Sequence, residues 1–402
     1  MLINEAEPVL GNRTNLIQKL SAEYKRRRFA RKVLLLHLIR RMSRVLYVAY
    51  PLLTVSSESA GGAEQVLWTL EREMARRGVL TSVAASAGSH VSGELLVTGE
   101  PCTQPDDYER RRAEHEEKIV ELVRQRSRDG KSFDLVHDMS GSFWRRAAEI
   151  DVPVLATLHL PRHFYPAESF ENVAGNVSFN CVSQSQHCSF ADLPNLVGVA
   201  PNGIALEKFG CGAEGGRYGE RTGLLWLGRI CEEKAPHLAL EIAKRAGLPI
   251  TLAGTVYPFS YHQQYFEREV APRLKQLPDA KFIPAPSLTT KRQLLHEAQA
   301  LLITSQVDET SSLVAMEAAA CGTPVIAFKR GALPEVVKDT VTGFIVENVA
   351  EAIAACARIL EISNSVCLEY AKENFSSTKM ADEYEGLYAR VARLEQFLSA
   401  VS

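Results

Sequence analysis

Short apolar runs alternate with longer amphipathic segments from Arg44 onward, and this alternation restricts the possible folds more than any other feature of the chain. Between the apolar runs lie helical segments such as Ala63–Arg77, whose apolar residues recur on one face. Strands that alternate with helices are typical of a mainly parallel sheet with helices on both sides, so we expect an α/β fold. In the first half, the apolar runs predict strands at Val45–Tyr50, Leu80–Ala85, Leu135–His137, Val154–His159 and Phe179–Val182.

A glycine-rich segment interrupts the pattern at Gly210–Gly223, where six of fourteen residues are Gly. Glycine clusters of this kind mark loops and domain boundaries. The simplest architecture is therefore two Rossmann-like αβα domains of similar size that face each other across a central cleft. In the second half, strands are predicted at Leu224–Leu227, Ile250–Ala253, Lys281–Ile283, Ala300–Thr304, Val325–Phe328 and Phe344–Val346.

These patterns divide the chain into four segments. Residues 1–43 form a basic extension, residues 44–205 a first domain, residues 206–376 a second domain, and residues 377–402 a C-terminal helix. Within Thr378–Ser399, apolar residues recur at helical spacing from Tyr384 to Phe397, which predicts a helix that closes onto the first domain.

Composition excludes several classes of protein. The 402 residues are 46% hydrophobic with a formal net charge of −2, so no overall basic field indicates nucleic-acid binding. The eight cysteines are scattered without a CxxC pair and no signal peptide precedes them, which favours a reducing cytoplasm. No apolar stretch approaches the roughly 20 residues of a membrane helix.

The N-terminal segment carries ten Lys or Arg against three Glu in residues 1–41, with most of the surplus in Lys25–Lys32. The apolar run Val33–Ile39 follows. One interpretation is weak, peripheral association of residues 25–41 with anionic lipid at the inner membrane face. The interpretation we favour is a solvated extension, or a segment that precedes a natural start at Met42.

Paired glycines open the segment SAGGAEQV, Ser59–Val66, where a loop leads from a strand into a helix. Gly61 and Gly62 let a backbone approach a ligand closely, and a helix N-terminus offers amides to an anion. The spacing is not GxGxxG, so a dinucleotide site is not indicated. An ordinary strand-to-helix turn is an equally good interpretation.

Two basic residues follow the predicted strand Leu224–Leu227 in the segment LGRICEEK. Arg229 and Lys234 project beyond the carboxyl end of this strand, where open α/β sheets bind ligands, and Lys234 is expected to start a helix. A guanidinium and an ammonium together suit a diphosphate. The alternative is surface ion pairing with Glu232 and Glu233.

Two glutamates, Glu309 and Glu317, are separated by seven residues that include Ser311 and Ser312, either of which is a natural helix N-cap. Along a helix this spacing spans roughly 12 Å, whereas the carboxyls of a glycosidase pair lie about 5–9.5 Å apart. We expect the two carboxylates to accept hydrogen bonds from hydroxyls at opposite ends of one ligand. The helix amides between them would bind its negative middle.

A histidine, His159, ends the predicted strand Val154–His159 and would face the cleft from the first domain. A histidine at a strand end is more often a packed or capping residue. His159 is a candidate site residue only because the other residues of the cleft have been identified.

With these motifs assembled, the chain resembles the group 1, family 4 glycosyltransferases of the GT-B fold from about Arg44 onward. The resemblance rests on GGAEQV, PNGI (Pro201–Ile204), LGRICEEK, TLAG (Thr251–Gly254), Glu309 and Glu317 followed by Cys-Gly-Thr-Pro-Val, and then RGALPEVV and TGFIV. The order and combination of these motifs are specific.

The resemblance implies a role for each matched residue. It makes Arg229 and Lys234 the residues that bind the diphosphate of the donor, Glu309 a contact of the donor sugar, and Glu317 the residue that holds the ribose hydroxyls. It places His159 beside the donor sugar. It adds a donor-binding set that comprises Gly62, Gly254, Ser311, Ser312, Leu313 and Val314.

The resemblance also implies a retaining, metal-independent reaction with a nucleotide-sugar substrate and no cofactor. The sequence itself also favours a reaction without a metal, because the chain has no DxD motif at a strand end and no dense His and carboxylate cluster. Two departures from the family leave the donor open. Thr310-Ser311-Ser312 follows Glu309 where the family has Pro-Phe-Gly, and Phe282–Pro286 replaces a glycine near the nucleotide base.

We therefore expect a retaining hexosyltransferase that uses a UDP-sugar in preference to a GDP-sugar and acts in the cytoplasm on cell-surface glycan or glycolipid. Residues 44–205 would bind a sugar or lipid-linked acceptor through Gly61, Glu64 and Arg162, and residues 206–376 would bind the donor. A nucleotide-sugar 2-epimerase and a catalytically impaired nucleotide-sugar-binding protein are the alternatives.

Overall fold

The computed structural model describes the whole chain except residues 1–43, 60, 103–104, 211–220 and 393–402. The basic segment 25–41, most of the glycine-rich segment and the end of the expected closing helix lie outside the described residues. Within the described residues, no helix is both long enough and apolar enough to cross a membrane. Two parallel sheets with flanking helices make up the rest, which confirms the predicted α/β fold.

The first sheet has seven parallel strands in the order β3-β2-β1-β4-β5-β6-β7. The chain reverses its direction of winding between β1 and β4, so a crevice opens there at the carboxyl ends of the strands. The strands are β1 Arg44–Val48, β2 Leu80–Ser86, β3 Glu94–Gly99, β4 Leu135–Asp138, β5 Val154–Leu158, β6 Val177–Cys181 and β7 Leu196–Val199.

The second sheet has six parallel strands in the order β10-β9-β8-β11-β12-β13, and its winding reverses between β8 and β11. The strands are β8 Leu224–Leu227, β9 Ile250–Gly254, β10 Ala280–Pro284, β11 Ala300–Ile303, β12 Val325–Phe328 and β13 Gly343–Val346. All eleven predicted strands are present within one or two residues, and the prediction missed β3 and β7.

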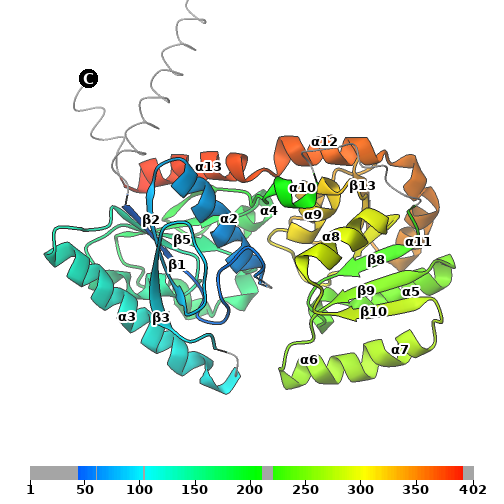
Figure 1. Cartoon of the computed structure of the whole chain (residues 1–402), viewed down its shortest axis with the longest axis horizontal. Helices are drawn as coiled ribbons and strands as arrows, with labels where there is room; N and C mark the ends of the chain where they lie inside the picture. The colour runs from blue at the N-terminus through cyan, green and yellow to red at the C-terminus, as the bar shows by residue number, and fades with distance from the viewer. Residues whose placement is uncertain (1–43, 60, 103–104, 211–220, 393–402) are drawn as a thin grey trace, which may run out of the picture.

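Helices cover both sheets, and Figure 1 shows the two domains side by side with α2 of the first and α8 and α9 of the second between the sheets. The helices of the first domain are α2 Gly62–Arg76, α3 Tyr108–Arg128 and α4 Gln184–Ser189. Those of the second are α5 Pro236–Ala246, α6 Ser260–Tyr265, α7 Ala271–Lys275, α8 Leu288–Glu297, α9 Leu313–Ala320, α10 Leu333–Val336, α11 Val349–Arg358 and α12 Asn364–Asn374. Short turns of other helix types are η1 Pro105–Asp107, η2 Phe143–Glu149, η3 Arg162–Phe164, η4 Ala167–Phe170, η5 Leu206–Phe209, η6 Glu232–Lys234, η7 Phe266–Val270 and η8 Ile359–Glu361.

The last described helix, α13 (Ser377–Val391), leaves the second domain and packs on the first, along the top of the left half in Figure 1. Its Tyr388 is buried against β1 and β4. The hydroxyl of Tyr388 lies 2.8 Å from Nδ1 of His137 and 3.1 Å from the hydroxyl of Tyr47. These hydrogen bonds satisfy polar groups in the core and fix the helix on the sheet.

Candidate functional site

A cleft between the two domains has two connected lobes, of about 830 and 460 Å³. We call them the large lobe and the small lobe. Gly62, Arg229 and Leu313 line both lobes, so one elongated ligand can reach from one to the other. The cleft opens at the carboxyl ends of the strands in both sheets, which is where open α/β sheets bind ligands.

The structure brings nearly all the predicted site residues to this cleft. Arg162 is the exception, because it lines neither lobe. Its guanidinium pairs with Asp192 at 3.0 Å and lies over the rings of Phe170 and Phe190. The lining residues that were predicted are Gly61, Gly62, Glu64, His159, Arg229, Lys234, Gly254, Glu309, Ser311, Ser312, Leu313, Val314 and Glu317.

Glu309 lies in the loop that leads into α9, at the large lobe. Its Oε1 accepts a hydrogen bond from Nζ of Lys234 at 2.5 Å and another from Oγ of Ser305. Lys234 therefore pairs with Glu309 across the loops and not with Glu232 or Glu233. Contrary to the prediction, Lys234 does not start a helix, because it ends the short turn η6 and α5 begins at Pro236.

Ser312 is the N-cap of α9, as predicted, and its Oγ accepts from the amide of Ala315. Five residues into the helix, Glu317 is buried with only 2% of its side chain exposed. Its Oε1 pairs with Nζ of Lys291 from α8 at 2.6 Å, whereas its Oε2 has no hydrogen-bond partner within the described residues. A buried carboxylate oxygen without a partner is costly, so a hydroxyl donor from a ligand in the small lobe would satisfy it.

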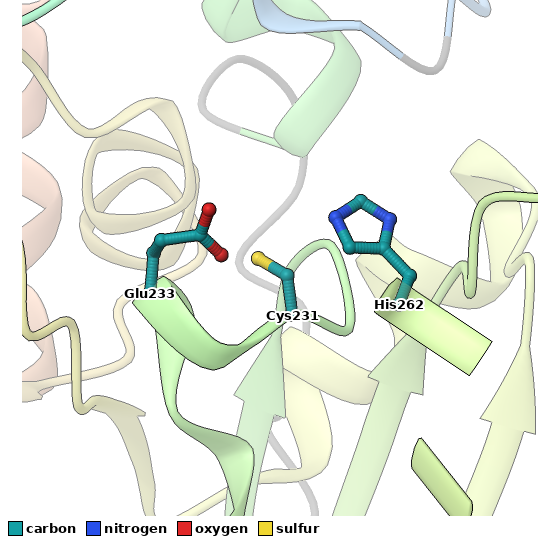
Figure 2. Close-up of side chains that lie close together, drawn as sticks. All are labelled: Cys231, Glu233 and His262. Atoms are coloured by element: carbon teal, nitrogen blue, oxygen red, sulfur yellow. The ribbon is translucent and has the colours of Figure 1, made fainter. Parts of the chain in front are cut away.

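Arg229 lies two residues after the end of β8 and lines both lobes. Figure 2 shows Cys231 and Glu233 on the next turn of the same segment. Burial lowers the pKa of Arg229, but Cys231 and Glu233 raise it, and the net shift is upward. The guanidinium therefore remains a cation at the junction of the two lobes, where it can neutralise a diphosphate.

His159 follows β5 and lines the large lobe. Burial lowers the pKa of its imidazole to about 4, so the ring is neutral at pH 7. The Nε2 atom is buried and has no hydrogen-bond partner within the described residues. The backbone oxygen of His159 accepts from Oγ1 of Thr310 at 2.8 Å, which joins the two domains beside Glu309.

Glu64 lies in the first turn of α2 with 5% of its surface exposed, and burial raises the pKa of its carboxyl to about 7. A side chain at Gly61 would collide with this carboxyl group and approach Leu53. A side chain at Gly61 would therefore displace the Glu64 carboxyl from its position beside the large lobe.

Residues of the cleft that the sequence analysis missed lie outside the recognised motifs. Lys291 is one. Trp68 and Lys208 line the small lobe, and Nζ of Lys208 lies 3.7 Å from the centroid of the Trp68 ring and 2.9 Å from the backbone oxygen of Ser57. Burial lowers the pKa of Lys208 to about 8. No local pattern distinguishes these side chains from ordinary surface residues.

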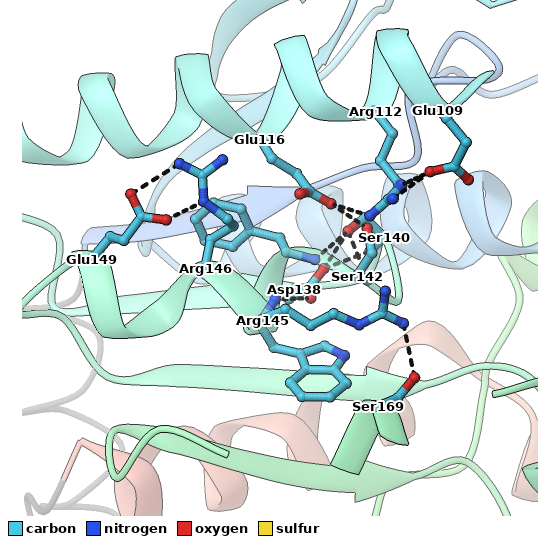
Figure 3. Close-up of polar contacts among 12 residues, drawn as sticks. Glu109, Arg112, Glu116, Asp138, Ser140, Ser142, Arg145, Arg146, Glu149 and Ser169 are labelled. Atoms are coloured by element: carbon cyan, nitrogen blue, oxygen red, sulfur yellow. Dashed lines mark hydrogen bonds and ion pairs between the residues drawn. The ribbon is translucent and has the colours of Figure 1, made fainter. Parts of the chain in front are cut away.

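A buried polar network at the end of β4 lies outside the cleft (Figure 3). Asp138 accepts from the amide and hydroxyl of Ser140, and Ser142 donates to Glu116, which also pairs with Arg112 at 3.4 Å. Burial raises the pKa of Asp138 to about 6. Because the carboxylates are held by neighbouring donors, the network serves to anchor η2 to α3 and not to bind a ligand.

Comparison with known proteins agrees with this geometry. Residues 213–374 match the family model described as "Glycosyl transferases group 1". A D-inositol 3-phosphate glycosyltransferase of Mycobacterium marinum is 33% identical over 163 residues, which are 38% of this chain and 34% of the relative. A lipopolysaccharide 1,2-N-acetylglucosaminetransferase of Salmonella typhimurium is 26% identical over 42% of this chain and 47% of its own length. The chain thus covers less than half the length of these relatives.

Two solved structures share the fold over most of the chain. AviGT4, a glycosyltransferase involved in avilamycin A biosynthesis, has a TM-score of 0.67 at 20% identity and covers 88% of this chain and 98% of its own. Anabaena HepE, crystallised with UDP and glucose, has a TM-score of 0.67 at 16% identity and covers 87% and 100%. Residues 213–374 of the second domain thus match the group 1 glycosyltransferase family, and the solved structures share the two-domain fold. These findings confirm the family resemblance and the GT-B fold predicted from the motifs.

Proposed function

We propose that this protein is a retaining, metal-independent glycosyltransferase that moves a hexose-type sugar from a UDP-sugar to an acceptor bound on the first domain. The observation that carries the proposal is that Glu309, Arg229 and Glu317 line one continuous cleft in that order. A sugar, a diphosphate and a ribose would meet them in the same order.

Charge stabilisation of the leaving diphosphate is the main catalytic contribution that the residues suggest. The guanidinium of Arg229 and the first amides of α9 face the middle of the cleft, and fixed cations and dipoles of this kind stabilise developing negative charge. Lys234, which pairs with Glu309, places a second cation beside the sugar position. These groups would neutralise the leaving group without a metal.

No side chain in the large lobe is arranged as an activated nucleophile within the described residues. The imidazole of His159 is neutral and Glu309 is engaged by Lys234 and Ser305. This arrangement favours attack by the acceptor on the same face as the leaving group, with a phosphate oxygen of the donor as the base. His159 would then hold the sugar or the acceptor hydroxyl by a hydrogen bond.

The donor is proposed to be a UDP-sugar because HepE, which shares the fold, was crystallised with UDP-glucose. The acceptor is proposed to carry an apolar part, because Leu53, Tyr108, Leu160 and Phe259 line the large lobe. A lipid-linked sugar combines hydroxyls for Glu64 and His159 with such a surface.

Calorimetric titration with UDP, GDP and ADP, with and without added Mg²⁺ or Mn²⁺, tests the donor site. We expect UDP to bind most tightly and added Mg²⁺ or Mn²⁺ to have no effect. Glu317→Gln should weaken UDP binding by about 10-fold or more, since a hydrogen bond to a charged group contributes about 1.5–3 kcal/mol. Glu309→Gln should retain UDP but lose transfer. Equal UDP affinity in wild type and Glu317→Gln would contradict the ribose assignment.

A second candidate is a nucleotide-sugar-binding protein without transfer activity. The ion pair between Lys234 and Glu309 favours it, because this pair occupies one oxygen of the carboxylate that would meet the donor sugar. Incubation with UDP-glucose separates the two functions. Release of UDP, by transfer or slow hydrolysis, supports the transferase, whereas binding without any release supports the second candidate.

A further inference from the structure

Three potential metal ligands, from the turn after β8 and from α6, lie close together near the donor cleft. Cys231 and Glu233 are on the turn after β8, and His262 is the third residue of α6, which follows the adjacent strand β9 (Figure 2). One atom from each side chain lies within 4.8 Å of the others. Within the described residues this is the one such group, and none of its three members lines the cleft.

The imidazole of His262 is buried without a hydrogen-bond partner among the described residues. It is only 1% exposed, and neither ring nitrogen has a hydrogen-bond partner within the described residues. Its ring is held between Phe259 and Tyr261, whose centroids lie 5.4 and 4.3 Å away. Buried polar groups are normally paired, so an orphaned imidazole beside a thiol and a carboxylate indicates a missing partner.

An explanation without a metal accounts for only part of the cluster. The thiol of Cys231 donates to the backbone oxygen of Arg229 at 3.6 Å and also interacts with the carboxylate of Glu233, so both side chains already have partners. These contacts leave His262 unpaired, and a packed aromatic residue would fill its position at lower cost. The geometry therefore needs a ligand that all three side chains can bind at once.

The donor set selects the kind of cation. One sulfur, one nitrogen and one carboxylate oxygen suit Zn²⁺, whereas Mg²⁺ and Ca²⁺ prefer oxygen ligands alone. Zinc bonds of about 2.0–2.3 Å put tetrahedral ligand atoms about 3.5 Å apart. Side-chain rotations that move the three atoms inward by about 1 Å would bring this cluster to that separation.

We propose that Cys231, Glu233 and His262 bind a Zn²⁺ ion, with water as the fourth ligand. The nearby guanidinium of Arg229 opposes a cation, but a thiolate and a carboxylate among the ligands outweigh this single positive charge. The ion would tie the turn that carries Arg229 to the aromatic wall at Phe259 and Tyr261. It takes no part in the transfer reaction, and the proposal does not depend on the function of the cleft.

The full-length protein, stripped of metal with a chelator, provides the test. Calorimetric titration with Zn²⁺ should reveal a site that raises the thermal midpoint of unfolding. Co²⁺ at the same site should give the near-ultraviolet charge-transfer band of a cobalt–thiolate bond. His262→Phe, which fills the aromatic pocket and cannot ligate, and Cys231→Ser should each lower Zn²⁺ affinity by at least about 100-fold. Cys231→Ser should also lose the cobalt band.

Cys188→Ser is the matched control, because Cys188 is an exposed thiol on α4 of the first domain. It should keep both the zinc site and the cobalt band. Absence of zinc binding by the wild type, or unchanged affinity in His262→Phe, would overturn the proposal. Loss of binding in Cys188→Ser alone would show that the metal binds a surface thiol and would overturn it equally. His262→Phe also covers the case in which Cys231→Ser fails to fold.

Discussion

Glu64 combines a buried carboxyl group with a position at the acceptor side of the cleft. Burial raises the pKa of the Glu64 carboxyl from 4.5 to about 7. This carboxyl occupies the space that a side chain at Gly61 would need. The folded protein therefore keeps this group protonated at pH values where an unfolded chain ionises it. Local sequence rules cannot predict such a shift, because they detect the glycine pair and not the burial of Glu64, the second residue after it.

The shift makes stability depend on pH with a definite sign. Between about pH 4.5 and pH 7 the folded state holds a proton that the unfolded state releases, so the free energy of unfolding falls as pH rises through this range. The loss amounts to about 3 kcal/mol above pH 7. Glu64→Gln should remove this component, so the variant gains stability over wild type at pH 8 but not at pH 4.

Urea denaturation of both proteins at pH 4 and pH 8 measures the difference. Glu58→Gln is the control, because Glu58 is an exposed carboxylate near the same helix. It should follow the wild-type profile. Parallel profiles for wild type and Glu64→Gln would show that the Glu64 carboxyl is solvated, and it would no longer be a candidate for holding an acceptor hydroxyl.

The other site residues fall into two groups, those that a nearby sequence pattern predicts and those that only the folded structure brings to the cleft. Arg229 and Glu309 could be predicted because both lie in loops that follow strands, β8 and β11, and parallel strands end at one edge of a sheet. Lys291 could not, because α8 carries no motif and the ion pair with Glu317 forms only when α8 packs beside α9. Trp68 could not, because it lies beyond the GGAEQV motif of α2 and meets Lys208 only in the folded protein. Arg162 was assigned to the cleft from its position after His159, but the loop turns its guanidinium toward Asp192.

At the level of elements, the same distinction between local and long-range information explains the strands that were missed. Both β3 and β7 lie at edges of the first sheet, and most of their residues are partly exposed. In these two strands the apolar run is short and does not alternate strictly with polar residues, and Gly198 further weakens the signal in β7. Central strands such as β8 and β12 matched the prediction from end to end because burial on both faces requires apolar residues throughout.

The loop that carries Glu309 is positioned by a second loop, through Gly331. The amide of Ala332 donates to the backbone oxygen of Glu309 at 2.7 Å, and Gly331 has a φ of +51°. A side chain on Gly331 would collide with the backbone of Asp308 and Glu309. This contact fixes the position of the Glu309 backbone, and with it the position of the Glu309 carboxylate in the large lobe.

We expect Gly331→Ala to displace the Glu309 loop. Transfer, or hydrolysis of the donor, should fall by about 100-fold, since small misplacements of positioning groups cost this much. UDP affinity should change little, because Arg229 and Glu317 do not depend on this contact. Initial-rate kinetics together with UDP titration separate the two effects.

Gly247→Ala provides a matched control. Gly247 has a φ of +66° and nothing within 4 Å of its missing side chain. The control should lose about 1–2 kcal/mol of stability from backbone strain and keep its activity. Equal activity loss in both variants would mean that strain alone, and not the collision with the Glu309 loop, is responsible.

The whole molecule is held in its present domain arrangement by contacts at several places around the cleft. Thr310 donates to the backbone oxygen of His159, and α13 crosses from the second domain onto the first. A third contact joins α10 to α4. The carboxylate of Glu335 accepts from the amides of Gln184 and Ser185 at 2.8 and 2.6 Å. A carboxylate on the first amides of a helix is a favourable but exposed interaction.

Removing the Glu335 contact should loosen the arrangement without unfolding either domain. An exposed carboxylate at a helix N-terminus contributes about 0.3–1 kcal/mol, so Glu335→Ala should shift the balance toward an open form by about two- to five-fold. Small-angle X-ray scattering should show a larger radius of gyration than for wild type, and a UDP-sugar should reverse part of the change. Glu347→Ala removes an exposed carboxylate that pairs with Lys329 inside the second domain, and it should scatter like wild type. If Glu335→Ala also scatters like wild type, α13 and the Thr310 contact suffice to set the domain arrangement.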